Sequence, residues 1–131
     1  MILDTSALLA ILLREPEAAQ FAKAMEDAPV VRMSVASFLE AAVTLERRRA
    51  EAPRLMLDAF VEEFGIRLEP VTVEQMRFAC EAFRYYGKGI HPAGLNYGDC
   101  FTYALARALR EPVLFKGEDF SRTDVRRAVD G

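Results

Sequence analysis

The sequence predicts a three-layer α/β/α fold, in which helices cover both faces of a central parallel sheet of about four to five strands. Short apolar segments typical of strands alternate with longer segments typical of helices, and capping residues or prolines separate them. The 131 residues are 52% hydrophobic and 28% charged, which is enough to bury a core. No repeat or linker divides the chain, so we expect one domain over residues 1–131.

The first half of the chain contains two predicted strands and four predicted helices. Pro16 stops the first helix, and Ser34 is a favoured N-cap for the long helix that follows the second strand. Pro53 suits a first helical turn, and Gly65 suits a helix end. In order, the predicted elements are a strand at 1–3, helices at 6–15 and 17–28, a strand at 30–33, and helices at 35–50 and 53–65.

The second half repeats the alternation of strands and helices. Thr72 and Asn96 are the predicted N-caps of two helices, and Pro112 ends the second helix. Between them, residues 88–96 combine glycine, proline and basic residues, which predicts a mobile surface loop. The predicted elements are a strand at 66–71, helices at 72–87 and 97–111, a strand at 113–115 and a C-terminal segment at 116–131.

Several function classes find little support in the composition. No apolar run approaches the roughly 18 residues that span a bilayer, and the N-terminus lacks the basic region of a signal peptide, so we expect a cytoplasmic protein. Cys80 and Cys100 have no metal-type spacing and are expected to be reduced, small apolar residues. His91 is the single histidine, which disfavours histidine-based metal sites and Ser-His-Asp triads.

Four acidic residues lie where a parallel sheet would bring them together. Asp4 follows the first strand and Asp119 follows the last, and the carboxyl ends of parallel strands share one edge of a sheet. Glu40 is the only charge in "VASFLEAAV" and has small or polar neighbours at helical spacing. Asp99 lies in the first turn of its predicted helix, and Gly98 beside it leaves room for a group to approach the backbone.

Each acid also has a purely structural interpretation. Asp4 can cap a helix, Glu40 can be a solvated helix residue, Asp99 can be an acid favoured by the helix dipole, and Asp119 can be a turn residue. Together they favour a site, because clustered carboxylates repel one another unless a cation joins them. Mg²⁺ suits such oxygen ligands, and Mn²⁺ can substitute for it. The chemistry predicted is metal-assisted hydrolysis of a phosphodiester.

The order of these motifs resembles the PIN-domain family, and more narrowly the VapC-type toxins of type II toxin–antitoxin pairs. The motifs are "MILDTSAL", then Ser-x-x-Ser-x-x-Glu ending at Glu40, then "LNYGDC", then "LFKGEDF-x-x-TD". The resemblance covers essentially the whole chain. It implies a PIN-like fold and a Mg²⁺-dependent endoribonuclease that cuts RNA, inhibits translation and is held inactive by a cognate antitoxin.

The resemblance also implies roles for individual residues. Asp4 and Asp99 would be direct metal ligands, and Glu40 would hold or activate the attacking water. Asp119 would complete the catalytic cluster. Thr5 or Ser6 would orient Asp4 or hydrogen-bond a phosphate of the substrate.

One motif departs from the family pattern. Many members carry an acid in a Thr-x-Asp motif directly after the last strand, where this chain has Phe115, Lys116 and Gly117. Asp119 lies two residues later and is expected to replace that acid, with Asp124 as the alternative.

RNA binding requires positive charge near the acidic centre. The net charge of −3 does not oppose this, because taking four acids into a metal site leaves the rest of the chain at +1. Tyrosines near the predicted loop can stack on unpaired bases or pack in the core. The candidate RNA-binding residues are Lys88, His91, Lys116, Arg122, Arg126 and Arg127, with Tyr85, Tyr86 and Tyr97 as stacking candidates. The basic run at 46–50 is interpreted as a solvated helix end.

The N-terminal helices and the stretch around Phe60, Val61 and Phe64 offer more apolar residues than a small sheet face requires. We therefore expect a homodimer and an antitoxin partner.

A receiver domain is a rival interpretation. Its phospho-acceptor aspartate should follow a middle strand, but the aspartate near the centre of this chain, Asp58, lies inside a predicted helix. An aspartate-nucleophile phosphatase would need an aspartate in place of Ser6. A catalytically inactive binding module with a PIN-like fold is the remaining alternative.

Overall fold

The computed structural model describes residues 1–129 and contains one sheet of four parallel strands. Residues 130 and 131, which end the predicted C-terminal segment, lie outside the described residues. The spatial order of the strands is β3-β2-β1-β4. The strands are β1 (Ile2–Leu3), β2 (Arg32–Ser34), β3 (Arg67–Glu69) and β4 (Val113–Leu114).

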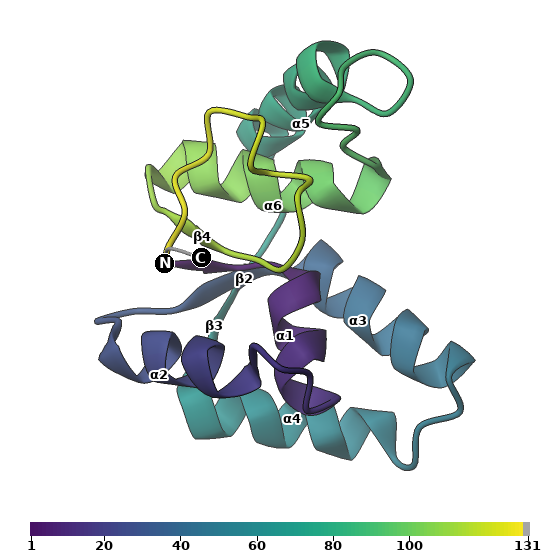
Figure 1. Cartoon of the computed structure of the whole chain (residues 1–131), viewed down its shortest axis with the longest axis vertical. Coiled ribbons are helices and arrows are strands. Elements are labelled where there is room, and N and C mark those ends of the chain that lie inside the picture. The colour runs from purple at the N-terminus through teal and green to yellow at the C-terminus, as the bar shows by residue number, and fades with distance from the viewer. Residues whose placement is uncertain (130–131) are drawn as a thin grey trace.

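Helices cover both faces of this sheet, which confirms the predicted three-layer architecture. In Figure 1, α5 and α6 lie on one side of the strands, and α1 to α4 lie on the other. The helices are α1 (Thr5–Leu12), α2 (Ala18–Asp27), α3 (Val35–Arg47), α4 (Pro53–Phe64), α5 (Val73–Tyr86) and α6 (Tyr97–Leu109). Because each helix lies within its predicted range or within one residue of it, the element order read from the sequence is confirmed.

The predicted N-caps are confirmed by their side-chain hydrogen bonds. Ser34, Thr72 and Asn96 each accept a backbone N–H from the first turn of α3, α5 and α6, respectively. The first helix differs slightly, because it begins at Thr5 and Asp4 itself is the cap. Asp4 therefore caps α1, in addition to any chemical role.

Alternating side chains of the short strands fill two separate cores. Leu3 and Leu114 point into the core shared with α1 to α4, and both are fully buried. Ile2 and Val113 point into the core shared with α5 and α6. This alternation is the ordinary period of a strand, and burial on both faces explains why the two strands β1 and β4 are apolar throughout.

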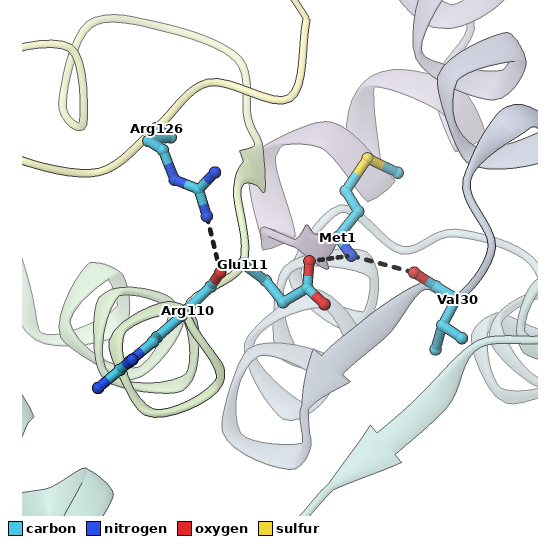
Figure 2. A network of polar contacts seen from close by, with 5 residues as sticks. All are labelled: Met1, Val30, Arg110, Glu111 and Arg126. Atoms are coloured by element: carbon cyan, nitrogen blue, oxygen red, sulfur yellow. Dashed lines mark hydrogen bonds and ion pairs between the residues drawn. The ribbon is translucent and has the colours of Figure 1, made fainter.

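The amino end of β1 is held by polar contacts at the sheet edge opposite Asp4 (Figure 2). The ammonium group of Met1 donates to the Val30 carbonyl at 3.0 Å and contacts Glu111 Oε2 at 3.2 Å. The Arg126 guanidinium donates to the Arg110 carbonyl at 2.7 Å. The backbone of residues 126–128 also pairs with Val113, so the C-terminal segment covers the outer edge of β4.

Residues 88–96 lie at the surface as the sequence predicts, with Lys88 and Ile90 exposed, but the segment is closed by hydrogen bonds. Lys88 N–H donates to the Leu95 carbonyl, and Leu95 N–H donates to the Tyr86 carbonyl, both at 2.9 Å. Ala93 and Leu95 are buried. The segment is therefore a hydrogen-bonded turn that is anchored in the core beneath α5 and α6.

The expectation of surplus apolar surface on the N-terminal helices and around Phe60 is wrong. Leu8 and Phe60 are buried in the core between α1, α2 and α4, and Val61 and Phe64 pack against it. Exposed large apolar side chains lie chiefly on α3 and α5, with single or paired examples on α4, β3 and α6. None of the helices described within residues 1–129 is long and apolar enough to cross a membrane.

Candidate functional site

The topology of the sheet places a site at the carboxyl ends of β1 and β4. From β1 the chain builds outward to β2 and β3, and then returns to the other side of β1 to form β4. Ligands of open α/β sheets bind where the strand order switches in this way. Asp4 follows β1, Glu40 lies on α3, Asp99 lies in the first turn of α6, and Asp119 follows β4.

Asp4 is buried and its carboxylate is fixed from both sides. Oδ2 accepts hydrogen bonds from the Ser6 backbone N–H at 3.0 Å and from the Ser6 hydroxyl at 2.6 Å. Oδ1 accepts one from the Thr102 hydroxyl at 2.6 Å. The carboxylate is thus held in one orientation by α1 and α6 together.

Asp99 is held by a capping box at the start of α6. Its backbone N–H donates to Asn96 Oδ1 at 2.8 Å, and its own Oδ2 accepts the Asn96 N–H at 3.0 Å. Burial of the carboxyl group raises its pKa to about 7, the charges of Asp4 and Asp119 add to the rise, and the bond from Asn96 opposes it. Asp99 therefore belongs to a buried acidic cluster in which its ionised form is destabilised relative to its protonated form.

Glu40 reaches the same cluster from α3 because Gly98 has no side chain. A Cβ built on Gly98 would lie 2.7 Å from Glu40 Cδ and Oε1 and would overlap Oε2. Burial raises the pKa of Glu40 and the charge of Asp4 raises it further, while a hydrogen bond with Thr5 lowers it. The missing side chain of Gly98 in "LNYGDC" thus leaves the space that the Glu40 carboxylate occupies.

The two candidates for the fourth acid lie in different environments. Asp119 is exposed and interacts with the Asp99 carboxyl group. Asp124 instead accepts a hydrogen bond from the Tyr103 hydroxyl at 2.7 Å. The structure therefore brings Asp119, rather than Asp124, beside Asp99.

Two hydroxyl groups join these elements, and sequence reasoning missed the second of them. Thr5 Oγ1 donates to the Ser37 carbonyl at 2.9 Å, which ties α1 to α3. Thr102 is fully buried, donates to Asp4, and lies 3.1 Å from the Ser37 hydroxyl. Its signal in the sequence is weak: it is a lone hydroxyl in the apolar stretch of α6, three residues after Asp99.

The predicted RNA-binding cations differ in their exposure and in their ion-pair partners. Lys88 and Arg122 are exposed. The Lys116 ammonium is paired with Glu15 at 2.9 Å and Glu17 at 3.1 Å. The Lys116 backbone N–H, in contrast, donates to the Ser6 hydroxyl at 3.0 Å and so joins the hydrogen-bond network of Asp4.

The donor set fits a hard divalent cation in its chemistry. The four acids supply only carboxylate oxygens, the ligands that Mg²⁺ and Mn²⁺ prefer. Burial, and to a lesser extent the charges of Asp4 and Asp119, raise the pKa of Asp99, and a bound cation would offset both effects. Among residues 1–129, no three His, Cys, Asp or Glu side chains already stand close enough to hold a metal ion. Binding would therefore require small side-chain movements.

Comparisons with known proteins identify the family and the fold of the chain. The sequence model of the PIN domain matches residues 1–126. Ribonuclease VapC28 of Mycobacterium tuberculosis is 49% identical over 131 residues, which cover 99% of this chain and 98% of that protein. The crystal structure of M. tuberculosis VapC20, described as a sarcin-ricin loop cleaving toxin, has a TM-score of 0.75 at 20% identity and covers 95% of both chains.

A second structural neighbour is a toxin–antitoxin complex from Klebsiella pneumoniae. It has a TM-score of 0.69 at 15% identity, and the match covers 94% of this chain and 92% of that one. At these identities the two structures establish the fold, and the sequence matches establish the family. The chain therefore belongs to the PIN-domain family, in the group of VapC ribonucleases.

Proposed function

We propose that residues 1–131 form a single nuclease domain, a Mg²⁺-dependent endoribonuclease that is the toxin of a toxin–antitoxin pair. The observation that carries the proposal is the grouping of Asp4, Glu40, Asp99 and Asp119 near the switch point, where burial, together with the charges of Asp4 and Asp119, raises the pKa of Asp99 to about 7. The names of the VapC relatives support the choice of RNA as substrate.

In this proposal Asp4 and Asp99 hold the cation, and Mn²⁺ can replace Mg²⁺. When bound, the ion lowers the pKa of water and neutralises charge developing on the phosphate. Ser6 and Thr102 keep the Asp4 carboxylate in its orientation. Glu40 accepts a proton from the attacking water, a role that suits a partly buried carboxylate with a raised pKa.

The remaining residues of the proposed site complete the acidic cluster or bind the substrate. Asp119 completes the cluster at its exposed side. Thr5 and Ser6 lie beside Asp4 and are placed to orient it or to hydrogen-bond a phosphate. Lys88 and Arg122 bind phosphates of the RNA chain, while Lys116 can do so only after it leaves Glu15 and Glu17.

We also propose a cognate antitoxin and a homodimer as the protein partners of this chain. The Klebsiella complex supports an antitoxin, because a chain of the same fold occurs there in a toxin–antitoxin assembly. The exposed apolar side chains on α3, β3 and α5 supply surface for protein contacts. The RNA substrate places the proposed enzyme in the cytoplasm.

Cleavage of a mixed RNA pool by the purified protein tests the function. We expect fragments with Mg²⁺ and none with EDTA, and the variant Asp99→Asn should be inactive. Asp27→Asn is a matched control, because Asp27 is an exposed acid on α2 whose partner is Lys23. Equal cutting by wild type and Asp99→Asn would refute the assigned centre.

A second measurement separates metal binding from catalysis. Mg²⁺ should raise the melting temperature of the wild type and of Asp27→Asn, but have little effect on Asp99→Asn, because an ion that binds only the folded state stabilises it. Intact metal binding without RNA cleavage by antitoxin-free protein would favour the inactive binding module instead.

A further inference from the structure

Tyr97 presents a large aromatic ring to solvent at the start of α6. Its side chain is 80% exposed, the highest value among the exposed large apolar residues within 1–129. The ring is nonetheless held in place, because it packs edge-on with the partly buried Phe101, one helical turn later, with centroids 5.0 Å apart and planes at 85°. The pair is an exposed but supported aromatic surface.

This surface adjoins the acidic cluster through the backbone. Tyr97 is the first residue of α6, Gly98 follows it, and Asp99 comes next. The Glu40 carboxylate lies against Gly98, and the capping box fixes the turn that carries Asp99. The ring is therefore attached to the helical turn that carries Asp99, and the Glu40 carboxylate on α3 contacts the same turn at Gly98.

The other tyrosines named as stacking candidates lie in different settings. Tyr86 packs against His91 and Tyr103, so its ring belongs to the core contacts of α5 and α6. Tyr85 is 61% exposed but lies in the last turn of α5, which carries none of the four acids. Among these three tyrosines, Tyr97 alone combines an exposed ring with a position on the helical turn that carries Asp99.

We propose that Tyr97, supported by Phe101, stacks on the base of the nucleotide next to the phosphate that is cut. Single-stranded nucleic acids commonly bind in this way, because every base has an aromatic face that an exposed ring can cover. The substrate then carries an unpaired base at the cleavage site, since a base inside a duplex is already stacked. This inference rests on the proposed ribonuclease function and adds a determinant of its substrate class.

Variants of Tyr97 test the proposal with an RNA that the wild type cuts. We expect Tyr97→Ala to lower kcat/KM by about 5- to 150-fold, mainly through KM, which is the range that base stacking supplies. Tyr97→Phe keeps the ring and should cut nearly as fast as the wild type. Leu55→Ala is the matched control, because Leu55 is 74% exposed on α4, on the other side of the sheet.

An abasic substrate tests the contact more directly. Removing the base beside the cleaved phosphate should slow the wild type to the rate of Tyr97→Ala and have no further effect on that variant. An equal effect of the abasic site on both proteins would overturn the stacking proposal. So would a change in molar mass of Tyr97→Ala by light scattering, because the ring would then belong to a protein interface.

A binding measurement keeps this test independent of catalysis. The chain has no tryptophan and four tyrosines, so stacking on Tyr97 should quench tyrosine emission when a short oligoadenylate binds in EDTA. Tyr97→Phe should bind equally well with less quenching, and Tyr97→Ala should bind weakly. Equal binding by wild type and Tyr97→Ala would refute stacking even where metal-dependent cleavage is established. Quenching in EDTA together with no cleavage in the presence of Mg²⁺ would instead refute the nuclease and leave the stacking contact established.

Discussion

Replacing Gly98 by alanine should separate catalysis from stability. The new Cβ would lie 2.7 Å from Glu40 Cδ and Oε1, whereas ordinary carbon contacts need about 3.5 Å, so the carboxylate must move by roughly 1 Å. A displacement of this size in a catalytic group costs on the order of 100-fold in rate. The strain is small because Glu40 is the flexible partner, and alanine favours a helix over glycine by up to about 1 kcal/mol. We therefore expect Gly98→Ala to be as stable as the wild type or slightly more stable, and about 100-fold slower.

The assay combines RNA cleavage with urea unfolding of the same preparations. A double-mutant cycle provides the control: if the alanine acts through Glu40, then Gly98→Ala should have no further effect on the rate of a Glu40→Ala protein. Wild-type cleavage by Gly98→Ala would refute the reasoning. A further loss of rate in the Glu40→Ala background would show that Gly98 acts through another group.

Three further predictions concern the acids and their partners. Thr102→Val should lower the free energy of unfolding by about 1–3 kcal/mol in urea titrations, because it removes a donor to the buried Asp4 carboxylate, and Thr102→Ser should restore most of it. The pKa of Asp99 is raised to about 7 from 3.8, so between about pH 4 and 7 the unfolded chain releases a proton that the folded chain keeps. The metal-free protein should therefore lose stability as the pH rises from about 4 toward 8, and Asp99→Asn should reduce this dependence of stability on pH. Identical melting curves of the two proteins across this range would contradict the raised pKa of Asp99. Asp119→Asn should slow RNA cleavage at least tenfold, whereas Asp124→Asn should leave the rate near that of the wild type, because Asp124 is engaged by Tyr103; the reverse order would identify Asp124 as the fourth acid.

Features set by local chemistry could be predicted from the sequence. Ser34, Thr72 and Asn96 are N-caps because their short polar side chains bond to nearby backbone groups, which needs no tertiary information. The parallel sheet followed from apolar strands that alternate with helices. The meeting of Asp4 and Asp119 at one sheet edge followed from that topology.

Features set by long-range packing could not be predicted in this way. The sequence does not indicate that the Thr102 hydroxyl donates a hydrogen bond to Asp4, which lies 98 residues earlier, or that the Lys116 ammonium pairs with Glu15 and Glu17. It also misplaced the exposed apolar surface, because the burial of Phe60 depends on how α4 packs beneath α1 and α2. These outcomes depend on side-chain directions that only the folded chain determines.

The central position of β1 has a consequence for biosynthesis. Ile2 pairs with Val113, so β1 completes its pairing only after β4, more than 100 residues later in the chain, has been synthesised. The acidic cluster likewise lacks a member until residue 119 has been translated. Synthesis runs from the N-terminus at about 5–20 residues per second, so a nascent chain that has reached residues 99–118 carries three of the acids without the fourth. In the proposed enzyme, the acidic cluster is therefore completed only after β4 has been made and the sheet can close.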